Sequence, residues 1–264
     1  MSKVEEDVVE RVVPDTESWD QFGLEHEQRY QFFSSYVKNK KVLDAACGTG
    51  YGSSLLHLLG GAKSVLGIDV SPEALDYAKR YLATHVSFKN HDCMKIDQLN
   101  EKFDVVISFE TIEHLSQPEE FIFKVCSVLE PGGIFICSTP NKERLSGAGN
   151  INPFHPSELS FHEFESAFEK YFNISGIYHQ SETVQYSRYL ELKHNNSKVG
   201  GRSAAYFFNR IENKIRKLLG KDFVYDPYIR KDLENMFEGD MEILPLKKGP
   251  LSWHKTFILT GIRK

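Results

Sequence analysis

Short apolar runs alternate with helical patterns between residues 41 and 140. Ser71-Pro72-Glu73 marks the clearest helix start, because serine caps a helix, proline fits its first turn and an acid suits its positive end. Strands that alternate with helices in this way build a parallel sheet. The apolar runs predict strands at Lys41–Ala46, Ser64–Asp69, His85–Lys89, Phe103–Phe109 and Gly133–Ser138.

Further elements are predicted on both flanks of this region. Leu24–Val37 has the pattern of an amphipathic helix, and its polar segment Glu25–Tyr30 is placed to cover a cofactor. Phe161–Tyr171 predicts another helix. Strands near Phe172–Gln180 and Trp253–Arg263 are expected to close the sheet as an antiparallel edge. The fold class is therefore α/β.

Residues 184–250 fit the alternation poorly, and we expect them to form a partly helical insertion or lid. Within them, residues 202–221 are basic around an apolar stripe and are followed by an acidic stretch. The favoured interpretation is a solvated face, and weak contact with a membrane surface is the alternative. We expect one domain over 1–264, with N-terminal cap helices in 1–40, a cofactor-binding core in 41–183 and the final strand in 251–264.

The composition limits the partners and the compartment. The chain has 264 residues, 41% of them hydrophobic, which is enough for one sizeable core. A net charge of -5 gives no overall cationic field, so nucleic acid is not an expected partner. The charged N-terminus and the lack of a long apolar run predict a cytoplasmic protein without a transmembrane segment. The cysteines lack metal-ligand spacing and are expected to be free thiols: Cys47, Cys93, Cys126 and Cys137.

The strongest motif is VLDAACGTGYG at residues 42–52, an apolar strand that runs into a glycine-rich turn. Gly48 and Gly50 permit close approach of a ligand and unusual backbone angles. A dinucleotide fingerprint requires a glycine where this chain has Ser53. Asp44 would repel a pyrophosphate but attract the cationic amino acid part of S-adenosylmethionine. The motif therefore favours the methyl donor over NAD.

Acids also follow the next strands. Asp69 ends the second strand, where it is placed to accept hydrogen bonds from ribose hydroxyls. Asp92 follows the third strand and is placed to accept from an adenine amino group, with Met94 packed on the ring. The fourth strand leads into Glu110 and then Glu113-His114, at the edge where open α/β sheets bind ligands.

In this order, the elements resemble the class I S-adenosylmethionine-dependent methyltransferases, over roughly residues 25–180 and the final strand. The resemblance implies a Rossmann-like doubly wound sheet of seven strands, mostly parallel with one antiparallel edge strand. It also implies S-adenosylmethionine as cofactor, with S-adenosylhomocysteine as its product. The segments 10–14 and 25–30 look similar to the opening of bacterial sugar and polysaccharide methyltransferases. The predicted cofactor residues are Tyr30, Asp44, Ala46, Gly48, Gly50, Asp69, Val70, Asp92, Cys93, Met94 and Glu110.

The acceptor is expected to be a polar small molecule. O-methylation of a sugar or a glycan terminus is the leading hypothesis, and N- or C-methylation of a small aromatic or quinone-like metabolite is the enzymatic alternative. A non-catalytic S-adenosylmethionine-binding scaffold, in which the insertion forms an oligomer interface, is a third hypothesis. An NAD-dependent oxidoreductase is disfavoured by the glycine spacing.

Methyl transfer to a hydroxyl requires alignment and removal of a proton. His114 is the first candidate base, because imidazole titrates near neutral pH and the residue follows the fourth strand. His155, near Glu158 on the loop after the fifth strand, is the second. The structural alternatives are a bond from His114 to a loop carbonyl and a helix N-terminal role for Glu158. No ligand spacing demands a metal, so none is predicted, although Glu113, His114 and His155 leave that alternative open.

Overall fold

The computed structural model describes residues 23–81, 86–143, 152–182, 241–245 and 255–264. Its strands are β1 (Lys41–Ala45), β2 (Ser64–Asp69), β3 (Ser87–Asn90), β4 (Phe103–Ser108), β5 (Leu129–Pro140), β6 (Phe172–Glu182), β7 (Met241–Pro245) and β8 (Thr256–Arg263). Its α-helices are α2 (Leu24–Phe33), α3 (Tyr51–Leu58), α4 (Pro72–Tyr81), α5 (Pro118–Val128) and α7 (Phe161–Glu169). Short 3₁₀ helices are η2 (Ser34–Val37), η3 (Cys93–Leu99) and η4 (Ile112–His114).

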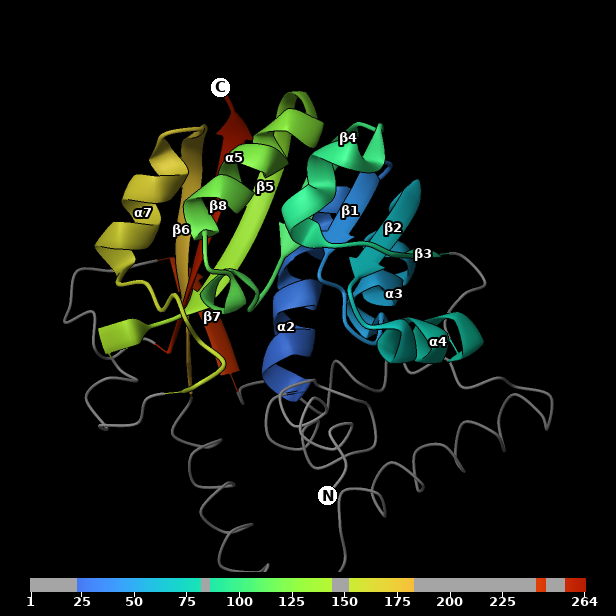
Figure 1. The fold of residues 1–264 in the computed structure, drawn as a ribbon, viewed down its shortest axis with the longest axis horizontal. Helices are drawn as coiled ribbons and strands as arrows, with labels where there is room; N and C mark the ends of the chain where they lie inside the picture. Colours follow the sequence, from blue (N-terminus) through green and yellow to red (C-terminus); the bar gives the residue numbers. More distant parts are fainter. Residues whose placement is uncertain (1–22, 82–85, 144–151, 183–240, 246–254) are drawn as a thin grey trace, which may run out of the picture.

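The described strands form one sheet in the order β3-β2-β1-β4-β5-β8-β6-β7 (Figure 1). Strands β1 to β5 are parallel to one another, whereas β8 is antiparallel to both β5 and β6. The strand order reverses between β1 and β4: the chain continues from β1 to β2 on one side of this pair and from β4 to β5 on the other. Such a switch point is where open α/β sheets bind ligands.

The Rossmann-like α/β class predicted from the sequence is confirmed, but the sheet differs from the expectation in two respects. The sequence predicted seven strands with the antiparallel strand at an edge, whereas β8 lies inside the sheet because it pairs on both sides. The eighth strand, β7, comes from the predicted insertion and pairs antiparallel with β6. Its five residues carry too little pattern to identify a strand whose partner is distant in the sequence.

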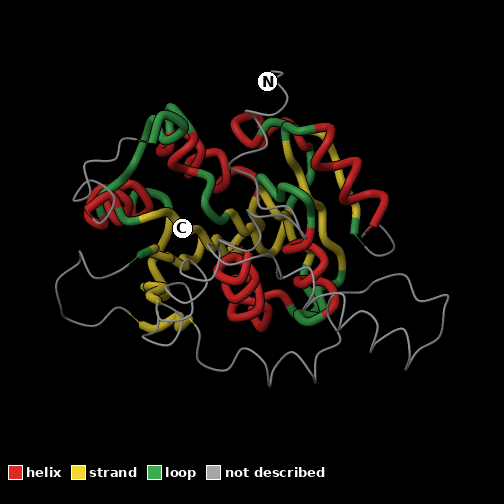
Figure 2. Tube along the Cα trace, turned by 90° about the horizontal axis from the view of Figure 1, so that it is seen from below, coloured by secondary structure: helices red, strands yellow, loops and turns green. Residues whose placement is uncertain are grey.

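Side chains of the central strands alternate between two apolar layers. Leu43 of β1 and Val106 of β4 belong to one buried cluster, and their neighbours Val42 and Val105 belong to the other. This period of two explains why the runs are apolar throughout, since both faces of a parallel sheet are covered. Helices lie on both sides of the strands (Figure 2). Residues of α5 and α7 complete the first cluster, and residues of α2 and α3 complete the second.

Local sequence signals explain the helix boundaries. The hydroxyl of Ser71 accepts a hydrogen bond from the backbone N–H of Ala74 (3.2 Å), so the predicted cap of α4 is present. A capping box formed by Ser160 and Glu163 begins α7. The helix predicted over Leu24–Val37 is α2 followed by the 3₁₀ turn η2. The basic stretch 202–221 and most of the predicted insertion lie outside the described residues, and the predicted division of the domain stays a prediction.

The four cysteines form no disulfide, in agreement with the prediction of free thiols. Among the described helices, none is both long and apolar enough to cross a membrane.

Candidate functional site

The turn after β1 has an unusual backbone. Ala46, Gly48 and Gly50 have positive φ angles of 63°, 55° and 77°, a region that disfavours side chains. A Cβ atom at Gly48 would meet no described atom within 4 Å, so this part of the turn is open to a ligand. A Cβ at Gly50 would lie 2.6 Å from the Phe88 ring and 2.8 Å from Ala78. Gly50 is therefore required by packing as well as by its backbone angle.

Asp69 holds this turn in place from the end of β2. One carboxylate oxygen accepts the backbone N–H of Gly48 (2.9 Å), and the other accepts that of Ser71 (2.9 Å). Each carboxylate oxygen can accept a second hydrogen bond. The side chain is therefore compatible with the predicted contact to ribose while it also orders the glycine turn.

Asp44 is fully buried at the end of β1. Its two oxygens accept hydrogen bonds from the hydroxyls of Tyr30 (3.0 Å) and Ser53 (2.6 Å). Burial raises the pKa of its carboxyl to about 6. A Cβ at Gly52 would lie 2.1 Å from the Tyr30 ring, so this glycine lets Tyr30 pack against the turn and reach Asp44. Contact of Asp44 with the methionine part of a cofactor stays a prediction.

The predicted adenine-binding residues lie together at the ends of β2 and β3. Asp92 caps η3 by accepting the backbone N–H of Met94 (2.8 Å). Cys93 is buried and Met94 packs against the core. Val70 follows β2 and exposes 57% of its surface, which leaves an apolar side chain available to a ring. These positions suit an adenine, and their assignment stays a prediction.

Sequence reasoning missed a buried charged network that joins α2 to the sheet. Arg29 is 1% exposed; its Nη1 donates to Gln180 Oε1 of β6 (2.7 Å) and lies 3.9 Å from Glu110 Oε1. Its Nε and Nη2 have no hydrogen-bond partner among the described residues. Glu110 also accepts the Ser138 hydroxyl (2.7 Å) and has a positive φ of 50°. Glu25, which lies on α2 with Arg29, forms an ion pair with Lys255, the residue before β8.

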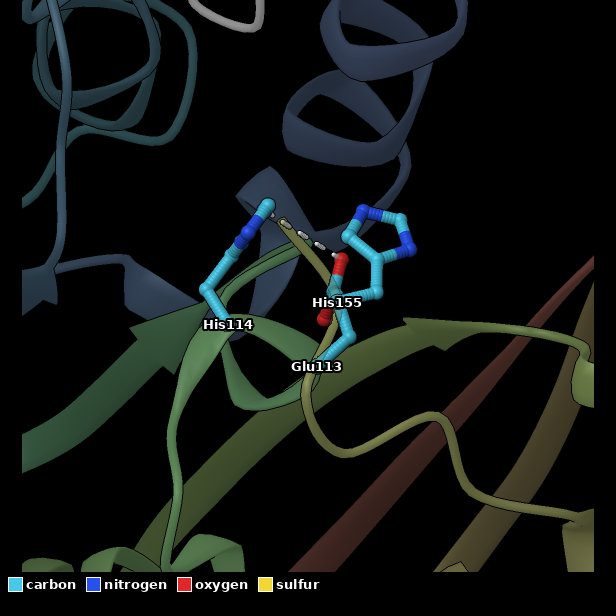
Figure 3. Close-up of side chains that lie close together, drawn as sticks. All are labelled: Glu113, His114 and His155. Atoms are coloured by element: carbon cyan, nitrogen blue, oxygen red, sulfur yellow. Dashed lines mark ion pairs between the residues drawn. The ribbon is translucent and has the colours of Figure 1, made fainter. Parts of the chain in front are cut away.

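A second group of polar residues converges beside this network: Glu113 and His114 of η4, and His155 of the loop before α7 (Figure 3). Glu113 Oε1 lies 4.0 Å from His114 Nε2, and the two imidazole centroids lie 4.8 Å apart. Glu113 is buried, and burial raises the pKa of its carboxyl well above the ordinary value, with the negative charge of Glu110 adding to the shift.

Both histidines are anchored through Nδ1. In the neutral imidazole, His114 Nδ1 donates to the carbonyl oxygen of Phe154 (3.0 Å). This is the bond to a loop carbonyl that the sequence suggested as the structural role of His114. His155 Nδ1 donates to Glu158 Oε1 (3.2 Å). Glu158 thus bonds a histidine, and the capping role near α7 belongs to Glu163. The structure brings the two alternative candidates, His114 and His155, together, and the catalytic role of either one stays a prediction.

The comparisons with known proteins agree with this fold. Residues 37–195 match the family described as "Methyltransferase domain". A probable S-adenosylmethionine-dependent methyltransferase of Mycolicibacterium smegmatis is 29% identical over 243 residues, which cover 89% of this chain and 86% of the relative. One from Mycobacterium tuberculosis is 31% identical over 160 residues, or 60% of this chain and 57% of the relative. The chain therefore spans little more than half the length of that second relative.

More limited matches give the wider context. The mitochondrial ubiquinone biosynthesis O-methyltransferase of Schizosaccharomyces pombe is 33% identical over 112 residues, which cover 40% of each chain. The crystal structure of MccD protein matches with a TM-score of 0.58 and 18% identity, over 90% of this chain and 97% of that one. The N-methyltransferase NodS of Bradyrhizobium japonicum, in complex with S-adenosyl-L-homocysteine, matches with a TM-score of 0.53 and 17% identity, over 67% and 89% of the two chains.

The structural matches support the fold alone at these identities, whereas the family match extends over more than half of the chain. It includes the glycine turn, Asp69, Asp92 and the cluster around Glu113. The resemblance to methyltransferases is thereby confirmed at the level of the family. The chain belongs to the class I S-adenosylmethionine-dependent methyltransferases.

Proposed function

We propose that the enzyme transfers the methyl group of S-adenosylmethionine to a hydroxyl oxygen of a polar small molecule, such as a sugar or a glycan terminus. The observation that carries this proposal is the pair of imidazoles, His114 and His155, beside the polar network at the end of β4. An oxygen acceptor must lose a proton as the new bond forms, and imidazole is suited to that task near neutral pH.

The binding of the donor follows from the geometry at the other end of the site. The glycine turn presents an open backbone at Gly48, and Asp69 stands beside it for the ribose hydroxyls. Arg29 has two buried donor nitrogens, Nε and Nη2, without described partners, next to Glu110. A buried unpaired donor is costly. A carboxylate of the methionine part would satisfy the guanidinium, and Glu110 would attract the neighbouring ammonium group.

The acceptor side combines polar and apolar contacts. Phe154 exposes 48% of its surface next to His155, and its carbonyl oxygen orients the His114 ring. An exposed aromatic ring beside imidazoles suits the apolar face of a sugar ring as well as a small aromatic acceptor. The partial match to a ubiquinone biosynthesis O-methyltransferase supports transfer to oxygen, since that is what the relative is named for.

Donor binding is tested first, by calorimetric titration with S-adenosylmethionine, S-adenosylhomocysteine and NAD. The two sulfur ligands should bind and NAD should not, and Asp69→Ala should abolish their binding. Arg29→Met should weaken S-adenosylhomocysteine by about tenfold to a hundredfold, because a hydrogen bond to a charged group contributes about 1.5–3 kcal/mol. Saturable binding of NAD in place of the sulfur ligands would refute the donor assignment.

Acceptor activity is tested by transfer of a labelled methyl group to a panel of sugars, glycans and catechols. His114→Ala should lower the transfer rate by about a hundredfold or more while leaving donor affinity nearly unchanged. His162→Ala is the matched control, because His162 lies exposed on α7. Transfer that occurs only to protein or nucleic acid, or an unchanged rate in His114→Ala, would count against the proposal.

A further inference from the structure

Glu113, His114 and His155 have the composition and spacing of a metal-binding site. Each offers one ligand atom, and the three atoms lie within 4.8 Å of one another. Two imidazole nitrogens and one carboxylate oxygen suit zinc and other divalent cations of the first transition series. Ligand atoms around such a cation lie about 3–3.5 Å apart, given metal–ligand bonds of about 2.1 Å. Side-chain movements of about an ångström would therefore close the site.

The partners of the two imidazoles already present the correct nitrogens. A carbonyl oxygen only accepts hydrogen bonds, so the bond to Phe154 keeps the proton of neutral His114 on Nδ1 and leaves a lone pair on Nε2. The Glu158 carboxylate does the same for His155. Metal-binding histidines usually have this arrangement, in which the second ring nitrogen donates to a carboxylate or a backbone carbonyl.

The backbone holds the two halves of the site together. The N–H of Ser157 donates to the carbonyl oxygen of Glu113 (3.1 Å), which ties the loop of His155 to η4. Asn152 accepts the N–H of Phe154 through its side chain (3.0 Å) and that of His155 through its carbonyl (3.1 Å). Residues that are far apart in the sequence are thus fixed beside one another before any ligand binds.

The charges in this region also favour a cation. Glu113 is 1% exposed, and its Oε2 accepts a long hydrogen bond from the Thr139 hydroxyl (3.4 Å). Glu110 lies close enough to add its own negative charge, which is partly offset by the guanidinium of Arg29, 3.9 Å from the Glu110 carboxylate. A buried carboxylate is stable when it is paired or coordinates a metal.

We infer that Glu113, His114 and His155 bind a divalent transition-metal cation, and that this cation binds the acceptor oxygen. The second part rests on the proposed transfer to a hydroxyl. The bound hydroxyl gives its proton to solvent, and the oxygen then forms a bond to the methyl carbon. The bond between that carbon and sulfur breaks, and its electron pair stays on sulfur, which leaves S-adenosylhomocysteine. The two imidazoles then act as ligands. The cation activates the hydroxyl in their place, by lowering the pKa of the oxygen bound to it.

Binding is measured on the full chain without donor or acceptor. Chelator-treated protein is titrated with Co²⁺, followed by its visible absorption, and with Zn²⁺ by calorimetry. One equivalent should bind, and Glu158→Gln should weaken binding by about tenfold to a hundredfold, as loss of an outer-shell partner does. His155→Ala should weaken it further, and His162→Ala should not change it. Circular dichroism verifies that each variant is folded.

Activity after removal of the metal tests the second part. Methyl transfer should fall at least tenfold in chelated enzyme and return with added cation. Absence of a cobalt spectrum, or metal binding that is unchanged in His155→Ala and Glu158→Gln, would overturn the metal site. Titration with S-adenosylhomocysteine tests the donor site separately. Full transfer by metal-free enzyme would overturn the role of the cation at the acceptor and return that role to the imidazoles.

Discussion

Replacing Asp44 with asparagine should stabilise the protein at neutral pH, and this gain should shrink in acid. Asp44 is fully buried, and burial raises the pKa of its carboxyl from 3.8 to about 6. A raised pKa means that the folded state disfavours the charged form. The corresponding stability is fully present below pH 3.8 and is lost as the pH rises through about 6.

The magnitude follows from the same two values. At about 1.4 kcal/mol per pH unit, the difference between 3.8 and about 6 corresponds to about 3 kcal/mol at neutral pH. The amide resembles the protonated carboxyl in size and charge, and the hydroxyls of Tyr30 and Ser53 can rotate to match it. The variant should therefore equal the wild type in strong acid. Between pH 4.5 and 8, its advantage in unfolding free energy should grow by about 2 kcal/mol.

Urea denaturation followed by circular dichroism at several pH values measures this advantage. Asp76→Asn is the matched control, because Asp76 lies exposed on α4 and the substitution removes the same charge at the surface. A difference between Asp44→Asn and wild type that stays constant from pH 4.5 to 8 would refute the reasoning. Weaker S-adenosylmethionine binding in the more stable variant would show that the buried charge serves the ligand.

Two further substitutions test the turn and the helix start. Gly50→Ala should lower the unfolding free energy by about 3 kcal/mol, because it combines a positive φ with a Cβ 2.6 Å from Phe88. Gly132 also has a positive φ, but a Cβ there would meet no described atom within 4 Å, so Gly132→Ala should cost only about 1 kcal/mol. If the two variants lose the same unfolding free energy, the proposed clash with Phe88 is wrong. Ser160→Ala removes the capping box with Glu163 and should cost about 1 kcal/mol in thermal or urea unfolding, without a change in donor affinity; an unchanged stability would show that the box contributes nothing.

The sequence was sufficient for the central sheet because its strands are apolar on both faces and are separated by strong turn signals. β1, β2 and β4 end within one residue of their predicted limits. β5 was predicted to begin at Gly133 but begins at Leu129, because Leu129 pairs with Phe103 of β4 and the pairing resumes at Ile134 after a register shift. Hydrogen bonding to a neighbour overrides such a local signal, and the sequence alone does not show the neighbour.

The cofactor turn was predictable for a similar reason, since Gly48 and Gly50 meet backbone requirements that are local. The burial of polar side chains on α2 was not predictable from the sequence. Glu25, Glu27 and Arg29 are polar residues that the pattern places at a surface, yet each is buried. Gln180 on β6, which bonds both Glu25 and Arg29, is distant from them in the sequence, whereas Glu27 bonds Gln31 of the same helix. Charged side chains are rarely buried without partners, so only the assembled structure reveals where they lie.

The position of β8 has a consequence for synthesis of the chain. This strand comes after all the others in the sequence, yet it lies between β5 and β6. While a ribosome is still making residues 256–263, both of those neighbours lack a partner along one edge. Unpaired strand edges of partly folded chains are sites of aggregation. The nascent chain should therefore depend on chaperones until β8 has emerged from the ribosome and paired with β5 and β6.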